Sequence, residues 1–176
     1  MSNKTATFFC SASNTIDPIY NKAAREVVRA ACLAGYVIAS GGTTKGTMKV
    51  VVDAARESGG KTLGVIPKFM DEHYNPEVDH VIWTETMAER KQILRDNSDI
   101  CIALPGGIGT LDELIETFVL VKLGKYKGKL IIFNYNHFYD KLKDLLDFYV
   151  STGMLDAPSR DLALFPETVQ ELVQLI

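Results

Sequence analysis

The stretch that decides the fold reads ICIALPGGIGTLDE and runs from residue 100 to residue 113. Its first five residues, 100–104, are apolar and have the length of a buried strand. Proline and three glycines then break the chain at 105–109, and a helical apolar spacing follows. Thr110 and Glu113 have the spacing of a capping box, so we expect a helix to begin there. The stretch therefore predicts a strand, a glycine turn and a helix.

The same strand, turn and helix unit recurs on both sides of this stretch. Apolar runs of strand length lie at 7–10, 36–39, 63–66, 81–83, 100–104 and 130–133, with a last short one at 162–165. Helical spacing fills most of the intervals. Asp17 before Pro18 predicts a helix start, and Gly35 predicts its end. Strict alternation predicts an α/β fold: a doubly wound, Rossmann-like, mostly parallel sheet with helices on both faces.

The composition limits the class of protein. The 176 residues fit one domain, 1–176, and a hydrophobic share of 47% with 23% charged residues is typical of a soluble chain with a core. A formal net charge of −3 argues against nucleic-acid binding. No apolar run approaches the ~20 residues of a membrane span, and no signal-peptide layout is visible. We expect a cytoplasmic protein whose three cysteines, Cys10, Cys32 and Cys101, are buried free thiols.

The turns after the strands are the expected place for a ligand, because open parallel sheets bind outside the carboxyl ends of their strands. The run 105–110 would expose backbone N–H groups at a helix N-terminus, which is a natural phosphate cradle. Arg90 and Lys91 would arrive from the preceding junction. The alternative is that these glycines only permit a tight turn.

Other nucleotide and metal motifs fail on spacing. A Walker loop places its lysine directly after a glycine. In the run GGTTKGT at 41–47 the lysine comes before the glycine instead, so the spacing fails. The run 107–112 lacks the third glycine of a dinucleotide fingerprint, and the second predicted strand ends in Ser40 rather than an acid. His73, His80 and His137 share no metal-like spacing, and we interpret them as surface or loop residues. We expect neither a metal nor a cofactor.

A charge pair completes the predicted site. Arg90 lies in the first turn of the helix after the fourth strand, and Glu113 in the first turn of the helix after the fifth. We expect these two strands to be neighbours, which would bring both side chains into one crevice. The alternative is that Glu113 and Glu89 only cap their own helices while Arg90 makes a surface ion pair.

At these residues the sequence resembles the Lonely Guy (LOG) family of cytokinin-nucleoside monophosphate phosphoribohydrolases. The resemblance rests on the motifs MAERK at 87–91 and PGGIGTLDE at 105–113, with Gly41, Gly42, Gly46 and Met48 matching an earlier glycine element. The chain departs from the pattern at Ala88, where plant members often have His, and at Lys49, where they have Gly.

The resemblance implies hydrolysis of the N-glycosidic bond of a purine nucleoside 5′-monophosphate, with Arg90 and Glu113 as the catalytic residues. The substrate-binding residues are expected to be Lys91, Gly106, Gly107, Ile108, Gly109, Thr110, Gly41, Gly42, Thr43 and Met87. The partner would be a small-molecule nucleotide, with no nucleic acid and no membrane.

The resemblance also implies a homodimer with its sites at the interface. The sequence favours a dimer independently, because the helix that follows residue 110 is apolar around most of its circumference and such helices are normally buried. The residues concerned are Leu111, Leu114, Ile115, Phe118, Val119, Leu120 and Val121.

Two other functions stay open from the sequence. The same motifs occur in nucleotide-binding relatives that carry molybdenum cofactor without cleaving it. A decarboxylase that uses pyridoxal phosphate is a third possibility, for which only Lys91 or Lys45 could form the Schiff base.

Overall fold

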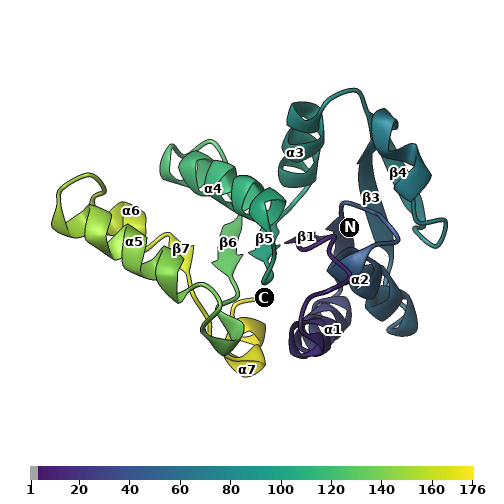
Figure 1. Ribbon diagram of the computed structural model, residues 1–176, viewed down its shortest axis with the longest axis horizontal. Helices are drawn as coiled ribbons and strands as arrows, with labels where there is room; N and C mark the ends of the chain where they lie inside the picture. The colour runs from purple at the N-terminus through teal and green to yellow at the C-terminus, as the bar shows by residue number, and fades with distance from the viewer. Residues whose placement is uncertain (1–3) are drawn as a thin grey trace.

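The computed structural model describes residues 4–176, and its centre is a seven-stranded sheet (Figure 1). The strand order is β4-β3-β2-β1-β5-β6-β7, and every neighbouring pair is parallel. The strands are β1 Thr5–Phe9, β2 Val37–Ser40, β3 Thr62–Pro67, β4 His80–Thr84, β5 Ile100–Ala103, β6 Lys129–Ile132 and β7 Ala163–Leu164. The predicted doubly wound parallel sheet is confirmed.

Helices cover both faces of this sheet. Those on one face are α1 Pro18–Leu33, α2 Gly46–Glu57 and α7 Val169–Val173, and those on the other are α3 Met87–Asp96, α4 Ile108–Lys122 and α5 Asp140–Ser151. The described residues also contain three short helices: η1 Lys68–His73, η2 Tyr135–His137 and α6 Ala157–Arg160. Figure 1 shows α3 and α4 on the side of the sheet opposite α1 and α7.

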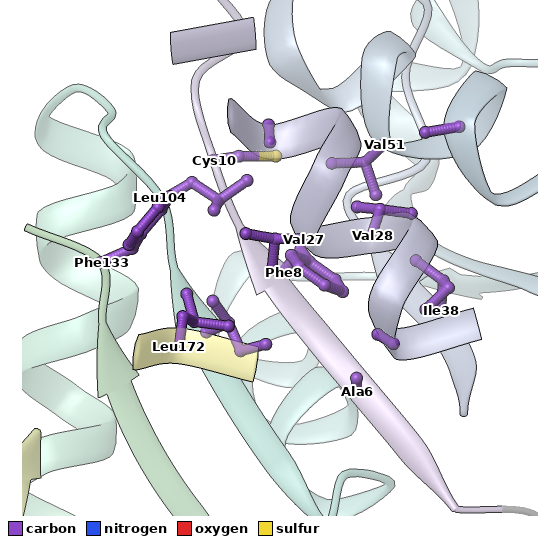
Figure 2. Packing of buried hydrophobic residues seen from close by; sticks show 14 of the residues in the cluster. Ala6, Phe8, Cys10, Val27, Val28, Ile38, Val51, Leu104, Phe133 and Leu172 are labelled. Atoms are coloured by element: carbon purple, nitrogen blue, oxygen red, sulfur yellow. The ribbon is translucent and has the colours of Figure 1, made fainter. Parts of the chain in front are cut away.

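The core follows from strand alternation. On β1, Ala6 and Phe8 face α1 while Phe9 faces the opposite layer. Figure 2 shows Phe8 packed beside Val27 and Val28 of α1, with Cys10 at the carboxyl end of the same strand. Burying one such side chain stabilises the fold by about 1.5–3 kcal/mol. The two apolar layers therefore hold the sheet in place, and the site is built at its carboxyl edge.

Helix caps formed where the sequence predicted them at two places. The Asp17 carboxylate accepts from the Ile19 amide at 2.9 Å before Pro18, and Gly35 follows α1 with φ +85°. The Thr86 hydroxyl accepts from the Glu89 amide at 3.1 Å and starts α3.

The predicted capping box at residues 110–113 is wrong. Helix α4 begins two residues earlier, at Ile108, with Gly107 as an N-cap that offers no side chain. Thr110 and Glu113 are buried inside the helix instead. The extended backbone of Gly107, at φ −86° and ψ −159°, lets the helix start directly at the turn and leaves both side chains free for other contacts.

The expectation that the fourth and fifth strands are neighbours is also wrong. Strand β4 lies at one edge of the sheet, and β3, β2 and β1 separate it from β5. Helix α3 makes this crossing over the face of the sheet: its Arg90 Nε donates to the Val65 carbonyl of β3, and its Leu94 carbonyl accepts from the Thr7 hydroxyl of β1. The long crossover therefore carries Arg90 from the edge towards the middle of the sheet.

The cysteines differ in detail from expectation. All three cysteines are free, but only Cys10 and Cys101 are buried, while Cys32 is partly exposed. The stretch 68–79 after β3 contains the short helix η1 and then pairs with the turn after β2. Within residues 4–176, none of the helices combines the length and apolar character needed to cross a membrane.

Candidate active site

A cavity of about 540 Å³ opens at the carboxyl edge of the sheet. Its walls come from the turns after β1, β2 and β3 and from the first turns of α3 and α4. Strand order reverses between β1 and β5, because β2 to β4 lie on one side of β1 and β5 to β7 on the other. Open α/β sheets bind ligands at this switch point, so the cavity lies where the topology predicts a site.

The Arg90–Glu113 ion pair lies in the wall of this cavity. Arg90 Nη1 donates to Glu113 Oε1 at 2.6 Å, and only 7% and 6% of the two side chains are exposed. Arg90 Nε donates to the Val65 carbonyl at 3.0 Å, which fixes the guanidinium plane. Glu113 caps no helix here, and Arg90 is not on the surface, so the alternative reading of the two residues does not describe them.

Gly41 makes room for this pair. A Cβ atom on Gly41 would lie 2.3 Å from Arg90 Nη2 and 2.9 Å from the sulfur of Met48. Any side chain at position 41 would therefore displace the guanidinium.

Burial perturbs the electrostatics of the Arg90–Glu113 pair. Burial raises the pKa of Glu113 above the ordinary glutamate value, and the Arg90 guanidinium opposes that rise without cancelling it. Burying two charges costs desolvation energy that their attraction only partly offsets. A carboxyl with a perturbed pKa in a cavity wall is typical of acid–base or electrostatic catalysis.

The N-terminus of α4 faces the same cavity through Gly107, Gly109 and Thr110. Among the described residues, the buried Thr110 hydroxyl has no hydrogen-bond partner. The helix start also lacks a side-chain cap. A buried hydroxyl without a partner costs about 1–3 kcal/mol, and helix N-termini attract anions. A phosphate or another oxyanion bound there would supply the acceptor.

The other residues predicted to bind substrate divide into two groups. Gly41, Thr43 and Met87 line the cavity. Gly42, Lys91, Gly106 and Ile108 are not among the residues that line it.

Each residue of the second group has a visible structural setting. Gly42 turns the chain at φ +62° with its Cα against Gly64, and a Cβ on Gly106 would strike the Thr110 side chain at 2.3 Å. Ile108 is 81% exposed. Lys91 Nζ pairs with Asp112 at 3.0 Å and with Glu116 at 2.5 Å, so its contact with substrate stays a prediction.

The cavity also includes residues that were not among the predicted substrate-binding residues. Cys10 and Ser11 come from the end of β1, Ile66 and Pro67 from the end of β3, and Met70 from η1. Their positions agree with the expectation that a ligand binds after the strand ends, because all parallel strands end at this edge.

His73 is the most informative of the missed residues. It was expected to be a surface or loop residue, but it lines the cavity. Its Nε2 lies 2.9 Å from Nζ of Lys45, another lining residue.

Known proteins resemble this chain along most of its length. The family model described as possible lysine decarboxylase matches residues 48–176. A Mycobacterium tuberculosis cytokinin riboside 5′-monophosphate phosphoribohydrolase is 34% identical over 172 residues, which cover 97% of this chain and 91% of that protein. The Arabidopsis thaliana cytokinin riboside 5′-monophosphate phosphoribohydrolase LOG5 is 32% identical over 173 residues, covering 97% and 76%. The chain belongs to the LOG family.

The LOG-family chain shares its fold with proteins that are named for binding or carrying molybdenum cofactor. The molybdenum cofactor binding protein from Rippkaea orientalis superposes with a TM-score of 0.74 at 22% identity, covering 99% of this chain and 96% of that one. The molybdenum cofactor carrier protein from Chlamydomonas reinhardtii gives a TM-score of 0.74 at 20% identity, covering 98% and 95%. At these identities the likeness shows the fold alone.

Proposed function

We propose that this LOG-family protein hydrolyses the C1′–N9 bond of a purine nucleoside 5′-monophosphate and releases the base and ribose 5-phosphate. The observation that carries the proposal is the buried Arg90–Glu113 pair, 2.6 Å apart, in one cavity with the uncapped start of α4. The names of the Mycobacterium tuberculosis and Arabidopsis thaliana relatives support the same reaction class.

Glu113 has the chemistry that this reaction needs. Breaking a ribosyl C–N bond passes through an oxocarbenium-like state with positive charge at C1′, as in glycoside hydrolysis. A carboxylate beside C1′ stabilises that charge, or takes a proton from the attacking water. The water oxygen bonds to C1′, the electron pair of the broken bond leaves with the base, and the proton lost by water ends on the base.

Arg90 orients Glu113 and favours its ionised form, against the effect of burial. Its guanidinium holds one carboxylate oxygen at 2.6 Å and is itself held by the Val65 carbonyl at 3.0 Å. The second carboxylate oxygen is thereby left to face substrate or water.

The start of α4 would bind the 5′-phosphate. Gly107 and Gly109 allow a close approach of the backbone, and the Thr110 hydroxyl supplies a donor that has no other partner among the described residues. Binding energy gained at the phosphate is then used to align C1′ against Glu113.

The carrier alternative is weaker for this chain. A protein that only carries a nucleotide or molybdenum cofactor gains from the phosphate cradle but has no use for a buried carboxylate beside it. The molybdenum-cofactor proteins share the fold at 20–22% identity, which carries no argument for their ligand here.

The positions of the lysines argue against a decarboxylase that uses pyridoxal phosphate. Pyridoxal phosphate chemistry needs a lysine amine for a Schiff base. Lys45 is the only lysine that lines the cavity within residues 4–176, and its Nζ is bonded to His73, while Lys91 is held by two carboxylates. These residues do not fit that cofactor, and we derive no step through it.

The base would be adenine, plain or N6-substituted. The relatives named above act on cytokinin riboside 5′-monophosphates by name. In this chain Met48, Ile66 and Met70 give the cavity an apolar wall, and flexible methionines adapt to substituents of different shape.

We further propose that residues 1–176 work as one cytoplasmic domain and form a homodimer. Support comes from exposed apolar side chains on and after α4: Val119 is 46% exposed and Leu123 62%. Light scattering at micromolar concentration tests the dimer, and a fully active monomer would exclude it.

The decisive experiment is a substrate panel. Purified protein is incubated with AMP, an N6-prenylated AMP, IMP, GMP, CMP and adenosine, and the free base is measured by chromatography. Base release from one or both adenosine monophosphates supports the proposal. Tight nucleotide binding with no base released from any of them would favour a carrier.

A further inference from the structure

Lys45 and His73 form a second polar pair in the cavity wall, to which no role has been given so far. Lys45 Nζ lies 2.9 Å from His73 Nε2, and both side chains are partly buried. An ammonium has three N–H donors, and the contact with His73 takes up at most one of them, so donors remain for a ligand.

The backbone holds this pair in place. The Thr44 amide donates to the His73 carbonyl at 3.0 Å, and the Asn75 amide donates to the Gly42 carbonyl at 3.0 Å. Thr43 and Tyr74 form an antiparallel bridge between these bonds. These bonds join the turn after β2 to the segment after η1. The backbone, and not only the side-chain rotamers, therefore brings Lys45 and His73 together.

The strand order places this pair on the other side of the cavity from the phosphate cradle. The cradle follows β5, Lys45 follows β2, and η1 with His73 follows β3. With about 4.8 Å between neighbouring strands, β5 and β3 lie roughly 14 Å apart. Arg90, anchored on β3, reaches Glu113 of α4 between these limits.

A nucleotide fits this order in one direction. Its phosphate belongs at the start of α4 and its C1′ beside Glu113, which directs the base towards β2 and β3. Ile66, Pro67 and Met70 line that part of the cavity and suit the flat faces of an aromatic ring, while Lys45 and His73 are the polar groups beside them.

We infer that Lys45, positioned by His73, donates a hydrogen bond to the edge of the nucleobase. The inference rests on the proposed function, because the direction of the ligand is fixed by the Glu113 site. As the C1′–N9 bond breaks, its electron pair leaves on the base, and a cation bonded to a ring nitrogen stabilises that charge. The pair would thus contribute to base recognition and to departure of the base.

The test compares a ligand that has the base with one that lacks it. Lys45→Ala and His73→Ala should lower kcat/KM for AMP by about 10- to 100-fold, the effect of one charge-assisted hydrogen bond. The inhibition constant of ribose 5-phosphate, which has no base, should change less than twofold. Lys45→Met, which keeps the length of the side chain, should behave as Lys45→Ala does.

The matched controls are Lys49→Ala in the first turn of α2, the helix that Lys45 precedes, and His80→Ala on β4; neither side chain is among those that line the cavity. Both should retain the wild-type kcat/KM. A double-mutant cycle between Lys45 and His73 should be strongly non-additive, because His73 acts through Lys45.

Two results would overturn the inference. One is an equal weakening of AMP and ribose 5-phosphate, which would move the pair to the phosphate or make it structural; the other is no weakening of AMP. Calorimetric binding of AMP and ribose 5-phosphate to Glu113→Gln, with and without Lys45→Ala, decides the matter without turnover. Failure of the proposed hydrolysis would therefore be seen separately, as wild-type protein that binds AMP and releases no base.

Discussion

Arg90 and Glu113 lie 2.6 Å apart although the strands that lead into their helices are separated by three other strands. Helix α3 closes that gap by crossing the sheet from β4 to β5, anchored over β3 through Val65 and over β1 through Thr7. The pair is therefore a product of the crossover, and its geometry depends on how α3 packs.

Glu113→Gln should abolish most of the turnover and spare the fold. The change removes the negative charge near C1′ but keeps the size of the side chain, and Glu113 caps no helix. Loss of one such group commonly lowers kcat by about 100- to 1,000-fold. Base release and melting temperature are measured together, with Glu26→Gln on α1, away from the cavity, as the control. A lowered melting temperature with normal turnover would make Glu113 structural.

Arg90→Ala should destabilise the protein, and more so at high pH. The change leaves the Glu113 carboxyl buried without its partner, so its pKa rises further in the folded state. A carboxyl whose folded pKa is raised loses stability as pH rises from its unfolded value through its folded value. We expect a loss of about 3–5 kcal/mol at pH 8 and a smaller one at pH 5, by urea unfolding. The double variant with Glu113→Gln should lose this pH dependence.

The pH profile of the wild-type enzyme should show an acid limb above that of an ordinary glutamate. Glu113 works as the carboxylate, and burial raises its pKa above 4.5. Activity should therefore fall as pH drops towards this raised value while the protein is still folded. Measuring kcat/KM and the circular dichroism signal from pH 4 to 9 shows whether activity is lost before the protein unfolds. A fall in activity that coincides with unfolding would contradict it.

Thr110→Val should weaken the binding of the phosphate without harming stability. The Thr110 hydroxyl is buried and has no partner among the described residues, so replacing it with a methyl group should keep or slightly raise the melting temperature. KM for AMP should rise about tenfold, while any residual cleavage of adenosine should stay the same. A melting temperature that falls by several degrees would point to an intramolecular partner for the hydroxyl.

Cys10 should resist alkylation although it lines the cavity. Burial raises the pKa of its thiol far above the ordinary cysteine range, with the Glu113 charge adding to the effect, so the reactive thiolate is scarce. Iodoacetamide at pH 8 should leave Cys10 intact in the folded protein and label it after unfolding, as followed by peptide mass mapping. Labelling of Cys10 in the native state as fast as in the unfolded chain would exclude a buried thiol.

The layer architecture could be predicted because it depends on local patterns. Apolar runs of four or five residues, the Asp17–Pro18 start and the Thr86 cap are each set by neighbours in the chain, and each was found in the structure. The glycine turn at 105–109 was equally local, apart from the exact start of α4.

Strand order could not be predicted in the same way. Sequence neighbours usually pair, but β4 and β5 do not, because the switch point places β5 beside β1. The Arg90–Glu113 pair was anticipated for an incomplete reason: the two side chains do share one edge, yet α3 rather than strand pairing brings them together. His73 was missed because its contact with Lys45 depends on the bridge between Thr43 and Tyr74, which are far apart in the sequence.

The close fit of Gly41 against Arg90 gives a criterion for judging other chains of this kind. A sequence can retain both charged motifs in full and still carry a side chain at the position equivalent to Gly41. In such a chain the added Cβ would lie 2.3 Å from the position of Arg90 Nη2, so the guanidinium could not occupy it. The carboxylate would then lose its orientation although both charged residues are still present. Sorting active from inactive copies by their catalytic motifs alone would therefore count these as enzymes. A glycine at position 41, which lies outside both motifs, therefore distinguishes the chains that can form the pair from those that cannot.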